Sequence, residues 1–285
     1  MKYAFIAEHR GLFSVTTMCR VLGVSKSGFF ASQERPPSKR ALADRQLVPI
    51  MLRVFLASDC TYGRERMVDE LAEMDIRVGK ARVARLMARH NMVPKARRLY
   101  KVTTQYRQGS TVLPDLVGRA FHAERPMQLL TGDITYVWTR EGWLYLAIVL
   151  DVCTRRIIGW STSKRIDTNL VLAAMRRALC GRVLEKGAIF HSDRGSQYCA
   201  TAFRDLLRQA GIRQSHGLSC YDNAITETVF HTIKTECVFF ETFNTRIQAH
   251  RRLFRYIDGF YNTRRRHTSL GTLSPARFEK QLALN

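Results

Sequence analysis

The stretch TGDITYVWTREGWLYLAIVLDVCTRRIIGWS, residues 131–161, contains three closely spaced apolar runs. The runs cover Ile134 to Trp138, Trp143 to Val152 and Arg156 to Ser161, and short connections separate them. Isoleucine, valine and aromatic residues are frequent in these runs, as they are in β-strands. The stretch therefore predicts three consecutive strands.

Downstream of this stretch, strand-like and helical patterns alternate. Short apolar runs at 188–191 and 212–215 predict two further strands, and helical spacing follows Thr168 and surrounds Phe203. Strands first, then alternating helix and strand, indicate a mixed sheet flanked by helices. Because this is the element order of the ribonuclease H-like fold, we predict an α/β domain with a mixed five-stranded sheet.

The first 95 residues or so have a helical pattern instead. Residues 14–30 have the dimensions of a helix-turn-helix unit, and a second pair of helices is predicted at 67–74 and 80–90. We therefore expect four parts: a helix-turn-helix-like segment at 1–38, a second helix-turn-helix DNA-binding domain at 39–98, a basic linker at 99–125, and the α/β domain with a basic C-terminal helix at 126–285.

The chain is strongly basic, with 46 Lys and Arg against 24 Asp and Glu and a formal net charge of +22. Both halves share this excess, which favours contact with nucleic acid along the whole chain. A basic protein that binds no nucleic acid is the alternative. The N-terminus does not resemble a signal peptide, and no apolar run is long enough to span a bilayer. We expect a cytoplasmic, nucleoid-associated protein that makes no membrane contact.

The seven cysteines form no C-x-x-C pair and are irregularly spaced. An odd number with this spacing disfavours both a disulfide framework and a zinc site. We interpret the cysteines as small apolar residues in a reducing compartment, and we expect no zinc.

Basic residues are concentrated between Arg77 and Pro114, where no acid occurs. Three arginines form a stripe on the second helix of the predicted helix-turn-helix, the helix that would enter the major groove. The alternative is a solvated charged face. The candidate DNA contacts in this region are Lys80, Arg82, Arg85, Arg89, Arg97 and Arg98.

Three carboxylates occur where phosphodiester chemistry would require them. Asp133 lies inside a predicted strand, Asp193 follows the end of a buried one, and Glu227 opens a helix. Carboxylate oxygens are hard ligands that suit Mg²⁺ or Mn²⁺, and two such ions roughly 3.5–4 Å apart can clamp an in-line displacement at phosphorus. Taken singly, each acid could equally be a turn, cap or surface residue.

Glu227 shares one helical face with His231 and Lys234, because these residues are spaced i, i+4 and i+7. The alternative for this face is an ordinary exposed pair. His191 and Asn223 are expected to support the acids rather than bind metal.

Motifs along nearly the whole chain resemble one family, the OrfB-type DDE transposases of the third bacterial insertion-sequence family. The matching stretches in the second half are GDITY at 132–136, GWLYLA at 142–147, HSDRGSQY at 191–198, Asp-Asn-Ala at 222–224 with Glu227, KTE at 234–236, YN at 261–262 and RRRHTSLG at 264–271. In the first half, LGVS at 22–25 and TYG at 61–63 also match. The catalytic core of this family is similar to that of retroviral integrases.

The resemblance implies metal-dependent DNA cleavage and strand transfer at insertion-sequence ends. Asp133, Asp193 and Glu227 would be the catalytic, metal-binding triad for two Mg²⁺ ions, with Mn²⁺ as a substitute. Implied partners are double-stranded DNA, as terminal repeats and target, a second copy of the chain on DNA, and the upstream-frame protein. Residues expected to face DNA are His231, Lys234, Arg264, Arg265 and Arg266.

Two positions depart from the family pattern. Thirty-three residues separate Asp193 from Glu227, about two fewer than usual, and we place the shortening in a loop at 215–220. Leu130 stands where the family commonly has Trp. Two other functions stay open: a non-catalytic DNA-binding regulator or partner subunit of a frameshifted transposase, and a nuclease of the same fold that does not join strands.

Overall fold

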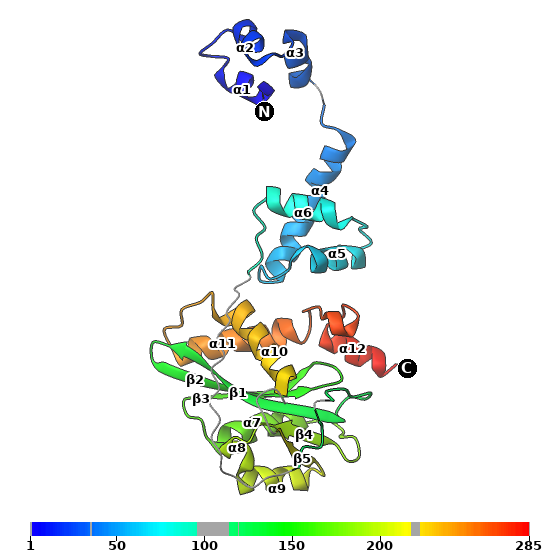
Figure 1. Ribbon diagram of the computed structural model, residues 1–285, viewed down its shortest axis with the longest axis vertical. Helices are drawn as coiled ribbons and strands as arrows, with labels where there is room; N and C mark the ends of the chain where they lie inside the picture. Colours follow the sequence, from blue (N-terminus) through cyan, green and yellow to red (C-terminus); the bar gives the residue numbers. More distant parts are fainter. Residues whose placement is uncertain (1, 35, 96–113, 119, 218–222, 285) are drawn as a thin grey trace. The chain divides into compact units, whose positions relative to one another are not determined.

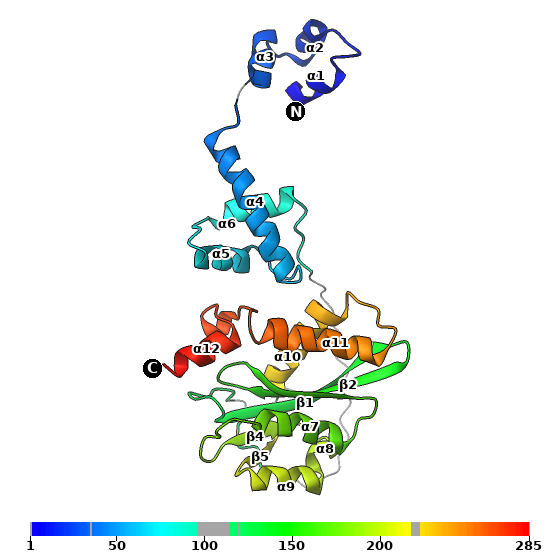
Figure 2. The same cartoon turned by 180° about the vertical axis from the view of Figure 1, so that it is seen from behind.

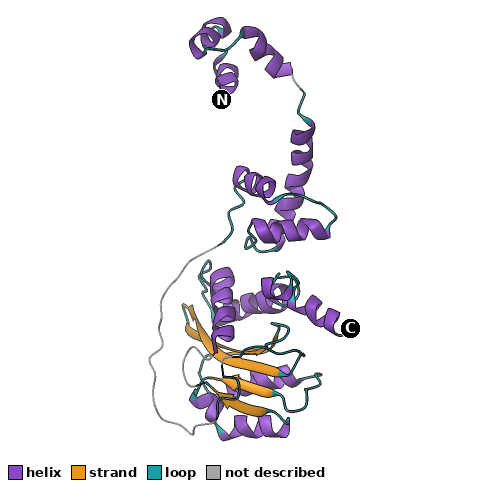
Figure 3. Cartoon of the chain, turned by 45° about the vertical axis from the view of Figure 1, so that its right-hand side comes forward, coloured by secondary structure: helices purple, strands orange, loops and turns teal. Residues whose placement is uncertain are grey.

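The computed structural model describes residues 2–34, 36–95, 114–118, 120–217 and 223–284. The chain forms two compact units, Met1–Leu52 and Arg53–Asn285. All the strands in the described residues belong to the second unit, whereas the elements before residue 95 are helices (Figure 3). No described helix is both long and apolar enough to cross a bilayer.

The first unit contains α1 (Lys2–His9), α2 (Val15–Leu22), α3 (Lys26–Glu34) and the start of α4 (Lys39–Ala57). Its small core is formed by Ile6, Met18, Cys19 and Phe29. Gly23 ends α2 at φ 63°, a left-handed conformation that glycine adopts without strain. The structure thus confirms the pair of helices predicted around this glycine.

The second unit begins with the end of α4, followed by α5 (Arg64–Glu73) and α6 (Lys80–Arg89). Met67 and Leu71 of α5 and Val83 and Leu86 of α6 are fully buried. Both helices lie where the apolar spacing predicted the second helix-turn-helix. Arg85 and Arg89 are exposed on α6 because the apolar stripe occupies its other side.

The sheet has the order β3-β2-β1-β4-β5. β1 (Leu129–Thr139), β2 (Gly142–Asp151) and β3 (Ile157–Ser163) pair antiparallel. β4 (Ile189–Ser192) and β5 (Arg213–His216) extend the sheet in parallel from β1. This mixed five-stranded sheet confirms the predicted ribonuclease H-like arrangement.

Helices cover both faces of the sheet (Figures 1 and 2). On one face lie α7 (Thr168–Leu179), α8 (Ser196–Cys199) and α9 (Thr201–Gln209), and on the other lie α10 (Ala224–Ile233) and α11 (Arg246–Tyr256). The main core lies between the sheet and the first group, and the fully buried Leu130 belongs to it. A Cβ on Gly159 of β3 would collide with the backbone of α7, so glycine permits their close approach.

Two helices on the other face continue into π-helical turns. α10 continues into η2 (Lys234–Val238), and α11 continues into η3 (Ile257–Tyr261). The chain then forms η4 (Thr268–Leu270) and α12 (Pro275–Leu282). The predicted basic C-terminal helix is therefore α11 with its π turn, and it ends before the arginines at 264–266.

Candidate active site

Asp133 lies in β1, the middle strand of the sheet, and Asp193 directly follows β4, the strand beside it. Thr131 of β1 pairs in parallel register with His191 of β4. Asp133 and Asp193 lie two residues farther along the same directions, and adjacent strands are about 4.8 Å apart. The register therefore brings the two acids to the same level, with Asp133 half-buried and Asp193 exposed.

The charges of Asp193 and Glu227 both affect the pKa of Asp133. Burial raises the pKa of Asp133 to about 8, and the negative charge of Asp193 contributes next. A hydrogen bond from the Ile134 amide, 2.7 Å long, and the ammonium of Lys234 oppose the shift, whereas Glu227 adds to it. Asp133 thus interacts electrostatically with both other members of the predicted triad and with the Lys234 ammonium.

The pKa values of Asp193 and Glu227 are also raised, mainly by desolvation. Burial raises the pKa of Asp193, against the effect of a 3.0 Å hydrogen bond that its Oδ1 accepts from the Gly195 amide. Burial likewise raises the pKa of Glu227, which lies on the exposed side of α10. Partly desolvated carboxylates near one another repel, and a bound cation would relieve that repulsion.

Hydrogen bonds attach the start of α10 to β1. Asn223 donates from Nδ2 to the Gly132 carbonyl over 3.1 Å, and Thr226 donates to the Thr131 hydroxyl over 2.8 Å. Thr226 is also 2.7 Å from Asn223 Oδ1. These buried contacts flank Glu227 and Asp133 in sequence, so they fix the helix carrying one acid to the strand carrying another.

His191 lies behind Asp193 in β4 and is fully buried. Its Nδ1 is 2.9 Å from the Ser215 hydroxyl of β5, and Phe121 packs edge-on against its ring. The side chain therefore connects the two parallel strands next to the acid. The structure places the first two residues of the shortened loop predicted at 215–220 in β5, and residues 218–220 lie outside the described part of the chain.

Lys234 and His231 continue the Glu227 side of α10. The Lys234 ammonium lies 5.0 Å from the centroid of the Tyr136 ring and interacts with Asp133. Burial lowers the pKa of Lys234, and the Asp133 charge opposes this. His231 is exposed one turn earlier. Lys234 therefore lies beside Asp133, and the DNA contact predicted for both side chains stays a prediction.

The predicted DNA contacts of α6 lie near its surface. Lys80 pairs with Glu65, and Arg85 and Arg89 are exposed, whereas Arg82 is half-buried. Arg97 and Arg98 lie outside the described residues.

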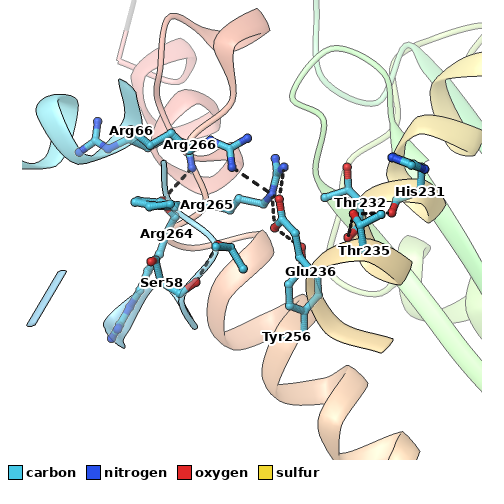
Figure 4. A network of polar contacts seen from close by, with 12 residues as sticks. Ser58, Arg66, His231, Thr232, Thr235, Glu236, Tyr256, Arg264, Arg265 and Arg266 are labelled. Atoms are coloured by element: carbon cyan, nitrogen blue, oxygen red, sulfur yellow. Dashed lines mark hydrogen bonds and ion pairs between the residues drawn. The ribbon is translucent and has the colours of Figure 1, made fainter. Parts of the chain in front are cut away.

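The three arginines at 264–266 differ from one another (Figure 4). Arg265 is buried and donates to both oxygens of Glu236, over 2.8 and 2.7 Å. Arg266 is buried and pairs with Glu70 at 2.9 Å and Glu73 at 2.8 Å. Arg264 is exposed. Only Arg264 of these three therefore presents its side chain to solvent.

Glu236 is the centre of a buried ion-pair network that the sequence did not reveal. Besides Arg265, it accepts a 2.7 Å hydrogen bond from the Tyr256 hydroxyl, and Arg66 of α5 lies 3.5 Å away (Figure 4). Burial alone would raise the pKa of Glu236, but the bond and charge of Arg265 outweigh it and lower the pKa. The network connects α5 with η2, the continuation of α10.

No three Asp, Glu, His or Cys side chains among the described residues are gathered closely enough to enclose a metal ion. Asp133 nevertheless interacts electrostatically with Asp193 and Glu227, and all three offer the oxygen donors that Mg²⁺ prefers. The donor chemistry of the site therefore fits divalent cations, although the three acids do not form a closed cage.

Comparison with protein families gives three matches. A family described as integrase core domain matches residues 123–219, and a second of the same description matches 227–282. A family described as HTH-like domain matches residues 41–100. The helical and α/β parts of the chain thus match separate families.

Similar proteins extend over the whole chain. Transposase InsF for insertion sequence IS3A of Escherichia coli K12 is 38% identical over 285 residues, covering 99% of either chain. An uncharacterized 31 kDa protein of insertion element IS600 from Shigella sonnei is 38% identical over 266 residues, covering 93% of this chain and 98% of that protein.

Solved structures with a related fold are more distant. A simian T-cell lymphotropic virus intasome has 12% identity and a TM-score of 0.45, covering 71% of this chain and 67% of that one. The HTLV-2 integrase catalytic core in complex with magnesium has 13% identity and a TM-score of 0.40, covering 55% of this chain and 98% of that one.

Proposed function

Because the chain belongs to the IS3 family of insertion-sequence transposases, we propose that Asp133, Asp193 and Glu227 are the acids at which it cleaves and joins DNA. The protein is a DDE-type polynucleotidyl transferase that acts in DNA transposition. The arrangement that supports this triad is the parallel register of β1 and β4, which brings Asp133 and Asp193 to the same level, together with the hydrogen bonds that hold the start of α10 against β1. Water and then a DNA 3′-hydroxyl would attack phosphorus in succession, without a covalent protein intermediate.

The proposed cofactor is a pair of Mg²⁺ ions, which Mn²⁺ can replace, and zinc has no role. Asp133, Asp193 and Glu227 would hold the ions. When bound, the ions supply Lewis acidity and lower the pKa of the attacking group. Asn223 and Thr226 keep α10 against β1, and Lys234 offers a cation to DNA phosphate beside the acids.

The triad is tested by replacing Asp193 with Asn. End cleavage and joining in Mg²⁺ are expected to fall by at least about a thousandfold, since a neutral amide binds a divalent cation poorly and metal catalysis contributes several kcal/mol. Asp205→Asn, an exposed acid on α9, is the matched control and is expected to retain activity. Unchanged cleavage by the Asp193 variant would remove it from the triad.

The same assay separates the alternative functions. DNA binding without nicking by the unaltered chain, in Mg²⁺ or Mn²⁺, would favour a regulator or a subunit that requires the upstream-frame protein. Nicking without a joined product would favour a nuclease. Because transposition joins two DNA ends, we further propose that at least two copies of the chain act together on DNA.

The second helix-turn-helix is proposed to bind DNA through α6, the helix that would enter the major groove. Arg89→Ala is expected to weaken binding to insertion-sequence ends and to reduce the slope of log K against log salt by about one, as for one lost phosphate contact. Arg208→Ala, the same charge change on α9, is the control. Equal salt slopes for the two variants would contradict a DNA contact at Arg89.

A further inference from the structure

The hairpin of β1 and β2 carries three exposed aromatic side chains, Tyr136, Trp138 and Trp143, which we call the aromatic strip. Their exposed fractions are 47%, 58% and 43%. Trp138 and Trp143 are cross-strand partners whose ring centroids lie 4.8 Å apart, and the Tyr136 centroid is 4.9 Å from that of Trp143. Large apolar rings usually lie in the core, so this cluster requires an explanation.

Polar contacts fix the backbone of the hairpin that carries the aromatic strip. The Thr139 hydroxyl donates to the Gly142 carbonyl over 2.6 Å, and the Arg140 amide donates to the Phe243 carbonyl over 2.9 Å. Arg246 of α11 donates from Nε to the Trp143 carbonyl over 2.9 Å. Since hairpin and rings are already ordered, a ligand that packs on them meets a small entropic cost.

The aromatic strip continues the strand that carries Asp133. At about 3.4 Å per residue, Tyr136 and Trp138 lie roughly 10 and 17 Å beyond Asp133, on the opposite face of β1 because their spacing from it is odd. Stacked nucleotides repeat at about 3.4 Å along a strand, so these lengths correspond to about three to five nucleotides. Lys234 connects the two regions, because its ammonium interacts with Asp133 and lies 5.0 Å from the Tyr136 centroid.

Flat rings beside a cation suit one class of ligand especially well. Nucleobases stack on aromatic side chains whatever their sequence, and cationic side chains hold the phosphates between them. Lys234 is at one end of the strip, and Arg140 and Arg246 are at the other. In edge-to-face pairs, the ring that contributes its edge keeps its faces available.

We propose that the aromatic strip binds unpaired nucleobases of the DNA strand, three to five nucleotides from the phosphodiester held at the triad. The inference rests on the proposed function only in placing that phosphodiester at Asp133. The strip would hold the strand end open while its backbone lies at the acids.

The test compares Trp138→Ala with the unaltered full chain in EDTA, using fluorescent oligothymidylate and a blunt duplex of equal length. The variant is expected to lose about tenfold or more in affinity for oligothymidylate, the loss of one stacked base, and less than twofold for the duplex. Trp138→Phe, which keeps a ring, should lose little. Phe254→Ala, an exposed aromatic on α11, should lose nothing.

Two results would overturn the proposal. One is an equal effect of Trp138→Ala on both oligonucleotides, or no effect on either. The other is a change in the sedimentation mass of the DNA-free chain, which would make the strip a contact between copies of the protein. Because binding is measured without metal or cleavage, failure of the triad assignment would appear separately, in the Asp193 assay.

Discussion

Replacing Asp133 with Asn is expected to reduce end cleavage and strand joining by at least about a thousandfold in Mg²⁺. Asp133 is the acid whose pKa responds to both other members of the proposed triad, so it lies at the electrostatic centre of the site. An amide cannot carry the charge that attracts divalent cations, and metal catalysis is worth several kcal/mol, with 1.36 kcal/mol for each tenfold in rate.

The free energy of unfolding of the Asp133→Asn variant shows whether its loss of activity comes from unfolding. Because the pKa of Asp133 is raised to about 8, the folded protein keeps a proton that the unfolded chain releases above about pH 4. The free energy of unfolding of the metal-free protein therefore falls as pH rises from about 4 to about 8. Asn carries no such proton, so the variant should be at least as stable at neutral pH, as measured by urea unfolding.

Asp151→Asn is the matched control for this variant. Asp151 is another acid of the sheet and is fully buried, and it accepts hydrogen bonds from the Met127 amide and the Thr154 hydroxyl, 3.2 and 2.6 Å long. Its replacement should lower stability while the folded fraction keeps its activity. Activity of the Asp133 variant within tenfold of the unaltered protein would contradict its role as a metal ligand.

The largest effect on stability is expected for Arg265→Ala, a loss of about 3–5 kcal/mol in the free energy of unfolding. The variant leaves the buried carboxylate of Glu236 without the two hydrogen bonds that Arg265 donates and without its nearest positive charge. Burial then raises the pKa of Glu236 against only the Tyr256 hydrogen bond and the Arg66 charge, so the acid tends to become neutral or to draw in water. Denaturant unfolding monitored by circular dichroism measures the loss.

Arg264→Ala provides the control, because its side chain is exposed and the substitution keeps its backbone hydrogen bonds, from its amide to the Phe260 carbonyl and from the Tyr62 hydroxyl to its carbonyl. It should change stability by less than about 0.5 kcal/mol. The double variant Glu236→Gln with Arg265→Ala should lose less than Arg265→Ala alone, since no charge stays buried without a partner. Equal losses for Arg264→Ala and Arg265→Ala would show that the ion pair does not contribute to stability.

The spacing of apolar residues and the order of the predicted elements along the chain were sufficient to predict the sheet and the helical pairs. Apolar runs and short connections predict β1, β2 and β3. The acids of the proposed triad also stand at recognisable places, with Asp133 inside β1, Asp193 just after β4 and Glu227 in the first turn of α10. The physical reason is that both signals are local: a strand and its neighbours are adjacent in sequence.

The ion-pair network could not be predicted in this way. Arg66 and Glu236 are far apart in the chain, and no spacing rule connects them. Three consecutive arginines at 264–266 look alike in sequence and were expected to face DNA. Burial distinguishes them, because Arg265 and Arg266 are buried in ion pairs with Glu236 and Glu70. The proposed DNA contact in this stretch therefore rests on the exposed Arg264. The aromatic strip could not be predicted either. The alternation of side chains along a strand places Tyr136 and Trp138 on one face, but it does not tell whether that face is exposed to solvent.

The π turn η2 sets the rotational phase of one long helical segment. A π turn holds one more residue than an α turn, and each residue advances an α-helix by about 100°. The extra residue thus lets the same segment place Glu227 near Asp133 and, farther on, direct Glu236 toward Tyr256 and Arg265. Deleting one residue from this turn would bring the two ends out of phase, so that either the acid or the anchor could be seated, but not both.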